Sequence, residues 1–128
     1  MNKENWNKFV KKLLSIGGKR VVEVYEEDLD KLLERGKVIA GKPHLITKGM
    51  QPSRCHQNSV YYHDKHIEKK PDLKIVTGWG LSEDDGLWRQ HTWLVNRNEI
   101  IETTVIRQVY FGFVLEGEEL DDFCWNNM

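Results

Sequence analysis

The sequence predicts an α+β fold, in which helices come first and a mainly antiparallel sheet follows. Three patterns indicate this fold class. The N-terminal part carries apolar residues at helical spacing, the second half carries short apolar runs separated by turn residues, and a helix start signal lies between them. We therefore expect a central helix packed against the sheet, with further helices at the N-terminus.

The first element is an amphipathic helix over about residues 4–16, which ends at Gly17. Its apolar residues recur at i, i+3, i+4, i+7 and i+8: Trp6, Phe9, Val10, Leu13 and Leu14. Every one of them falls on the same face of a helix. This face is expected to lie in the core.

Short elements are expected between the first helix and the middle of the chain. Valines at 21–24 predict a short strand, and Asp28 is a suitable N-cap for a short helix that ends at Gly36. Residues 38–40 are expected to be extended. Residues 41–50, with a proline and a glycine, are predicted to be a loop.

The central helix is predicted to begin at Ser53, a good N-cap, and to run to about Lys69. Cys55 then lies in its first turn. The remaining elements are strands at 73–77, 87–95, 100–106 and 109–115, with a break at 78–80, turns at 84–86 and 96–99, and a last short helix around Leu120 and Phe123.

Length and composition are those of one ordinary globular domain over residues 1–128. A net charge of −1 argues against a dedicated nucleic-acid-binding protein. Lysines interrupt the N-terminal apolar residues, so no signal peptide is expected, and no apolar run has the length of a membrane span. Two cysteines are too few for a disulfide scaffold and indicate the reducing cytoplasm.

Cys55 is the strongest candidate for a nucleophile. A free thiol has a pKa of about 8.5 and is mostly un-ionised at neutral pH. The unpaired N–H groups and the dipole at a helix start favour the thiolate, and the same groups can donate to an oxyanion. Cys124, in contrast, is expected to be a buried small hydrophobic residue.

Five histidines are candidates for the base. His63 and His66 lie eight and eleven residues beyond Cys55 on the same helix, roughly 12 and 16 Å away. His56 diverges from its neighbour by about 100° around the helix. His44, in a loop, remains possible, whereas His91 is favoured because a separate strand can bring it to the sulfur.

Glu102 is expected to orient His91. If the turn between their strands has two or four residues, His91 lies opposite Thr104, and Glu102 is its diagonal neighbour on the same sheet face, about 7–8 Å away. The carboxylate would then stabilise the positive imidazole. A turn one residue longer or shorter would direct Glu102 to the other face, and Asn58 or Gln51 would be the polar partner instead.

Polar residues near Cys55 are candidates for lining the site. Asn58 and Ser59 follow Cys55 at i+3 and i+4, on the same helix face. A serine nucleophile fits less well, because Ser59 lies one turn away from the N–H groups and Ser53 is explained as a cap.

These residues resemble the papain-like superfamily of cysteine hydrolases, including its NlpC/P60-type and transglutaminase-like branches. The resemblance covers about residues 51–112 and rests on a Cys at a helix start, a His91-Thr92-Trp93 strand and a following Glu102-Thr103-Thr104. It implies a central helix that bears the nucleophile and packs on an antiparallel sheet, as in small bacterial or phage-borne members. It also implies a thiol hydrolase or acyltransferase that forms a thioester. We expect it to need no cofactor.

The chain departs from papain in three respects. His56 stands where papain has a Trp, the nearest Gln is Gln51 at four rather than six residues before the nucleophile, and the third residue is Glu rather than Asn or Asp. Gln51 remains a candidate oxyanion donor, and Trp93 a candidate on the substrate side. The attacked bond can be a peptide, isopeptide, other amide or ester, and the acceptor water or an amine.

Two other classes of function remain open. A metal-binding module would use Cys55 and the histidines, but only His63 and His66 have helical ligand spacing, and no CxxC or HExxH pair is present. A non-catalytic binding protein of the same fold would use an aromatic surface, expected at Trp79, Trp88, Tyr110 and Phe111. No metal, nucleic acid or membrane is expected as a partner.

Overall fold

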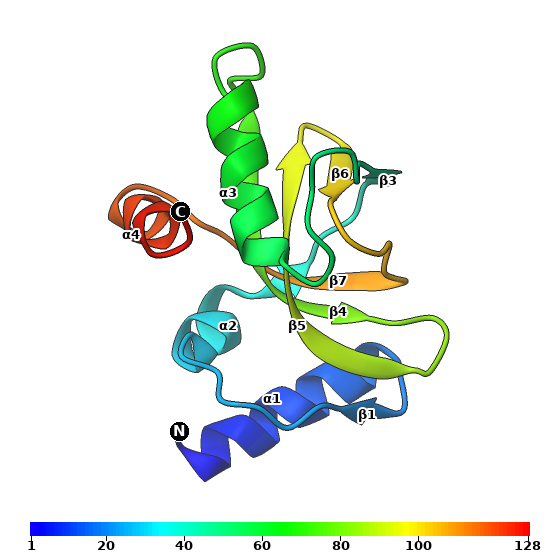
Figure 1. The fold of residues 1–128 in the computed structure, drawn as a ribbon. Helices are drawn as coiled ribbons and strands as arrows, with labels where there is room; N and C mark the ends of the chain where they lie inside the picture. The colour runs from blue at the N-terminus through cyan, green and yellow to red at the C-terminus, as the bar shows by residue number, and fades with distance from the viewer. The chain divides into compact units, whose positions relative to one another are not determined.

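The computed structural model describes residues 1–128 and confirms the α+β class, with four helices and a seven-stranded, mostly antiparallel sheet (Figure 1). The helices are α1 (Lys3–Ile16), α2 (Leu29–Arg35), α3 (Cys55–His66) and α4 (Glu118–Asn126). The strands are β1 (Arg20–Val21), β2 (Lys37–Val38), β3 (Lys42–Leu45), β4 (Leu73–Leu81), β5 (Leu87–Asn96), β6 (Glu99–Glu102) and β7 (Val109–Val114). Their order in the sheet is β2-β7-β4-β5-β6-β3, and β1 pairs with β5.

The residues form two compact units. The first consists of residues 1–39, 78–90 and 107–113, and the second of residues 40–77, 91–106 and 114–128. Strands β4 and β5 therefore contribute residues to both units. The single-domain organisation stays a prediction. No helix is long and apolar enough to cross a membrane.

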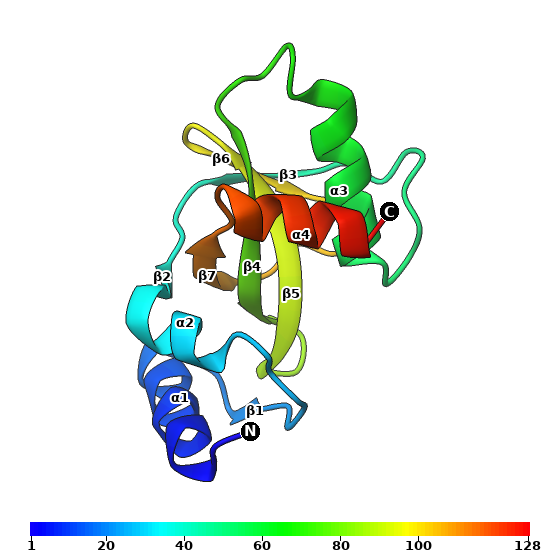
Figure 2. The same cartoon turned by 90° about the vertical axis from the view of Figure 1, so that its left-hand side faces the viewer.

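The first unit has an aromatic core. Helix α1 buries Trp6, Phe9 and Leu13, as its helical spacing predicts. The Phe9 ring lies 5.6 Å from that of Trp79 and 6.0 Å from that of Phe111. In both ribbon views α2 lies beside α1 (Figures 1 and 2). The helical face expected in the core is therefore the one that packs.

A buried carboxylate fixes the segment between β1 and α2. Glu26 is 8% exposed, and its Oε1 accepts a hydrogen bond from the indole Nε1 of Trp79 at 2.7 Å. Its Oε2 accepts from the backbone N–H of Asp28 at 2.9 Å. Burial raises the pKa of Glu26 against the effect of these donors.

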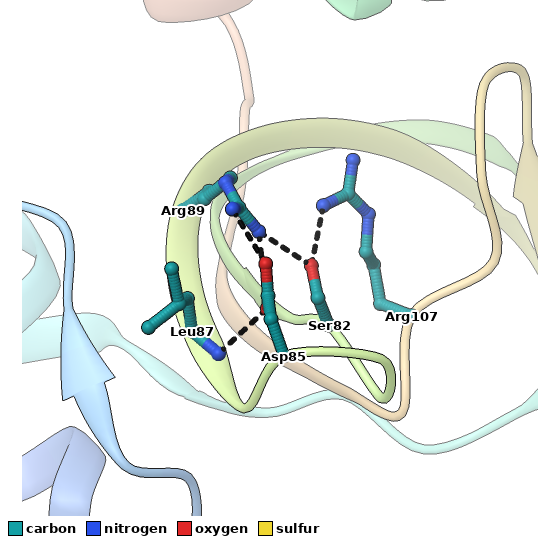
Figure 3. Close-up of polar contacts among 5 residues, drawn as sticks. All are labelled: Ser82, Asp85, Leu87, Arg89 and Arg107. Carbon is teal, nitrogen blue, oxygen red and sulfur yellow. Dashed lines mark hydrogen bonds and ion pairs between the residues drawn. The ribbon is translucent and has the colours of Figure 1, made fainter.

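Polar contacts also hold the turn between β4 and β5 (Figure 3). The Ser82 hydroxyl accepts hydrogen bonds from Arg89 Nη1 at 3.0 Å and Arg107 Nη1 at 3.3 Å. Asp85 accepts from the Leu87 N–H at 3.0 Å and from Arg89 Nη2 at 2.7 Å. The turn expected at this point is therefore present, and two guanidinium groups converge on one hydroxyl.

The predicted break at residues 78–80 is wrong, because β4 continues through both glycines to Leu81. A Cβ at Gly78 would overlap the backbone oxygen of Phe111, and one at Gly80 would lie 2.7 Å from the Arg107 side chain. Glycine serves here for close approach rather than for a turn.

The loop predicted at residues 41–50 is wrong in its first half, where β3 pairs in parallel with β6. This strand ends the strand order, and an edge strand tolerates the proline that suggested a loop. Three elements end earlier than the sequence predicts. Strand β1 stops at Val21, β6 at Glu102 and α3 at His66.

In the second unit, the β5–β6 hairpin and helices α3 and α4 surround the residues of interest. Figure 1 shows α3 in green beside the yellow strands of the hairpin. The two helices contact each other, since the ring of His56 on α3 lies 5.3 Å from that of Phe123 on α4. This arrangement leaves the start of α3 next to β5.

Candidate active site

Cys55 is the first residue of α3, as the sequence predicts, but Ser53 is not its cap. The N-cap is Arg54, which makes no side-chain capping bond, and Ser53 has a φ of 61°. The Arg54 N–H donates to the Gln51 carbonyl at 3.3 Å. Proline followed by a residue of positive φ is typical of a type II turn, so Pro52 and Ser53 form a turn that leads directly into the nucleophile candidate.

The side chain of Asn58 fastens this turn to the helix. Its Oδ1 accepts from the backbone N–H of Gln51 at 3.0 Å, and its Nδ2 donates to the Gln51 carbonyl at 2.8 Å. Asn58 is buried. It therefore positions the backbone before Cys55, and both its oxygen and its amide nitrogen are engaged.

His91 and Glu102 reach each other through the register of the hairpin. Asn96 pairs with Glu99 and Leu94 with Ile101, so the turn has two residues. This is one of the two turn lengths that place Glu102 diagonally from His91 on the same face. His91 Nε2 and Glu102 Oε1 are 2.6 Å apart.

The other carboxylate oxygen of Glu102 also accepts hydrogen bonds. Oε2 accepts from the backbone N–H of Thr104 at 3.0 Å and from the Thr104 hydroxyl at 3.1 Å. The Glu102 side chain has no exposed surface, and that of His91 is 1% exposed. The ring of His91 also stacks on Trp93, with centroids 5.8 Å apart. The imidazole thus has a fixed orientation.

Cys55 and His91 are joined by a hydrogen bond, which changes the pKa of both. Burial alone would raise the pKa of the Cys55 thiol, but bonding to His91, the charge of His91 and the Thr92 N–H outweigh it and lower the pKa. Burial alone would lower the pKa of His91, but Cys55 and Glu102 outweigh it and raise the pKa. Both shifts favour transfer of the proton from the thiol to the imidazole.

The structure brings together Cys55, His91 and Glu102 in one chain of hydrogen bonds. Because Nε2 of His91 faces Glu102, Nδ1 is the ring nitrogen left for the sulfur. Cys55 is only half-buried, so a reagent can reach it. Such a chain can make a thiolate, deliver a proton to a leaving group and take one from water.

The other residues expected in the site have different surroundings. Ser59 and Trp93 are fully buried and so do not line an accessible surface. The Ser59 hydroxyl has no hydrogen-bond partner, and Asn58 is engaged with the loop. Gln51 is exposed beside the start of α3, where its side chain remains a candidate donor.

The remaining histidines lie elsewhere. His44 Nε2 is 3.6 Å from Glu99 Oε1, and His56 contacts Phe123. The ring of His66 lies 4.2 Å from that of Tyr62. No three His, Cys, Asp or Glu side chains are grouped to hold a metal ion. The aromatic surface expected for a binding protein is wrong, since all four residues are buried: Trp79, Trp88, Tyr110 and Phe111.

Sequence reasoning missed three features. Thr104 supports Glu102, a contact that depends on the bend in the chain after β6 and has no sequence signal. The Thr92 N–H bonds to the sulfur, which depends on packing and has no sequence signal. Arg54 lines a cavity of about 720 Å³ along α3, which no sequence pattern reveals.

No protein-family model, curated protein or solved structure matches this chain.

Proposed function

We propose that the protein is a thiol-dependent hydrolase or acyltransferase with Cys55 as nucleophile, His91 as acid and base, and Glu102 as the residue that orients His91. The observation that carries the proposal is the continuous contact from the Cys55 sulfur through His91 to Glu102, with the 2.6 Å bond at its buried end. We propose further that the arrangement is papain-like, with a helix that bears the nucleophile beside an antiparallel hairpin.

The reaction would proceed in two acyl transfers. The Cys55 thiolate attacks the carbonyl carbon of an amide or ester, and the His91 imidazolium gives its proton to the departing amine or alcohol. A thioester remains on Cys55. Neutral His91 then takes a proton from water or an amine as that acceptor attacks the thioester, which releases the acyl product and restores the thiolate–imidazolium pair.

The start of α3 offers donors for the oxyanion. The backbone N–H of Cys55 lies in the first turn, where N–H groups have no partner within the helix. The Gln51 side chain, on the loop fastened by Asn58, is the second donor we propose. Both cysteines are free, and a thiol nucleophile fits a reducing compartment such as the cytoplasm.

Profiling against a panel of amide, peptide, isopeptide and ester substrates tests the proposal. Cys55→Ala and His91→Ala should each abolish turnover, and the double variant should be no worse than either, because the two residues act as a unit. His44→Ala, a change on β3 outside the site, is the control and should retain activity. Turnover that persists in Cys55→Ala, or losses that add across the pair, would refute the shared mechanism.

A further inference from the structure

A cavity of about 720 Å³ lies along α3, between this helix, the loop before it and α4. Its volume is that of a site for a small molecule or a short chain. The N-cap Arg54 lines it together with the α3 residues Asn58, Tyr61 and Asp64, which follow Arg54 at i+4, i+7 and i+10. The cavity extends to Arg54, the residue directly before Cys55, whereas Cys55, His91 and Glu102 do not themselves line it.

The two ends of the cavity differ in charge. Arg54, which directly precedes Cys55, is exposed and makes no ion pair. Asp64 lies ten residues further along α3, about 15 Å away along the helix axis. The cavity is therefore cationic beside Cys55 and anionic at the end near α4.

Cys124 on α4 lines the anionic end. Burial raises the pKa of its thiol, and the charges of Asp121 and Asp64 raise it further. His63, which also lines the cavity, has its pKa lowered by burial and is mostly neutral at neutral pH, so it does not cancel Asp64. Cys124 therefore lines one end of the cavity, and Cys55 directly follows Arg54, which lines the other end.

We infer that this cavity binds the substrate of the proposed reaction and selects an elongated, amide-bearing chain that is anionic near Cys55 and cationic near α4. The inference rests on the proposed function for its link to turnover. Arg54 would bind a carboxylate or similar anion, and Asp64 an amine. The carboxamides of Gln51 and Gln57 line the cavity and can pair with amide groups of the chain.

The two cysteines serve as reporters of local charge. Each is modified by an anionic and a cationic methanethiosulfonate of equal length, with the other cysteine replaced by serine. Because a thiolate itself favours the cationic reagent, the readout is the change in the anionic-to-cationic rate ratio upon substitution. At Cys55, Arg54→Gln should lower this ratio about fivefold, the effect of one charge at about 4 Å in water. Lys69→Gln, which removes an exposed positive charge beyond the other end of α3, should leave it unchanged.

At Cys124, Asp64→Asn should raise the same ratio about fivefold, while Glu68→Gln should leave it unchanged. A five-residue peptide amide with an acidic residue at one end and lysine at the other should protect both thiols. Peptides with two acidic or two basic residues should protect less. Ratios that do not respond at either thiol, or equal protection by all three peptides, would overturn the inference. Failure of the proposed function would look different. The modification rate of Cys55 would then depend on pH as that of a free thiol does, while the anionic-to-cationic rate ratios would still change with Arg54→Gln and Asp64→Asn.

Discussion

Glu102 shows how one residue acquires its role from its surroundings. An acidic residue on a strand is usually exposed, but this one is fully buried between His91 and Thr104. Each of its oxygens receives hydrogen bonds, which compensates for burying a charge. The turn length needed for this arrangement could be predicted from the sequence. The Thr104 contacts could not, because they depend on how the chain bends after β6.

Glu102→Gln should lower kcat/KM, at the lower end of the roughly 10²–10⁴-fold that positioned proton transfer contributes. The amide can still accept from His91, but it removes the negative charge that helps raise the pKa of the imidazole. The basic limb of the pH–rate profile should therefore move to lower pH. Glu99→Gln, an exposed change on the same strand, is the control. A basic limb that stays in place would show that Glu102 does not tune His91.

Ser53 illustrates the limit of reasoning from residue type. Serine before a helix usually indicates a cap, but here it adopts a positive φ in the turn after Pro52. The sequence signal was therefore correct for the position of the helix start and wrong for its chemistry. Ser53, two residues before the nucleophile candidate, thus has a conformation that L-residues rarely adopt, and such conformations persist only where the surrounding structure imposes them.

At the scale of elements, β4 and β3 show why boundaries were harder to predict than the site. Glycine and proline indicate breaks when only the local sequence is considered. In β4 the glycines admit a neighbouring strand, and in β3 the proline lies at a sheet edge. Both outcomes depend on which strands become neighbours, information that a local pattern does not contain.

Gly78→Ala should lower the free energy of unfolding by about 1–3 kcal/mol, because a Cβ would meet the Phe111 backbone oxygen rather than a side chain that can move. Gly17→Ala is a matched control in the same unit, where the nearest atom to a new Cβ is a Leu81 methyl at 3.5 Å. Chemical denaturation measures both. If Gly78→Ala lowered the free energy of unfolding no more than Gly17→Ala does, β4 and β7 would not approach each other as closely at Gly78 as the structure shows.

At the scale of the whole molecule, the sequence predicted the fold class, the four helices and the convergence of Cys55, His91 and Glu102. It did so because these features depend on hydrophobic period, helix start signals and hairpin register. The division into two compact units and the cavity along α3 were not predictable, since each depends on how distant segments pack.

Stability of the whole chain should depend on pH through Glu26. Burial raises its folded-state pKa above the unfolded value of about 4.3, so the folded state holds the proton more tightly. The stability that this group contributes is full below the unfolded pKa and is lost as pH rises through the folded pKa. Between these values, wild-type stability relative to Glu26→Gln should fall as pH rises.

Chemical denaturation from pH 4 upward measures this difference, with exposed Glu27→Gln as the control. Subtracting the variant removes the contribution of other carboxylates, such as Asp85, whose pKa is lowered by its bond to Arg89. A difference that grows with pH would mean that the donors from Trp79 and Asp28 outweigh burial, contrary to the direction given above.

The central claim is that Cys55 is a thiolate paired with His91, and the pH dependence of its alkylation tests this most directly. In Cys124→Ser protein, the rate of modification by iodoacetamide should rise with an inflection well below the free-thiol value of about 8.5. His91→Ala should move the inflection upward, since it removes the bond and charge that lower the pKa. An inflection near or above 8.5, unchanged by His91→Ala, would contradict the account.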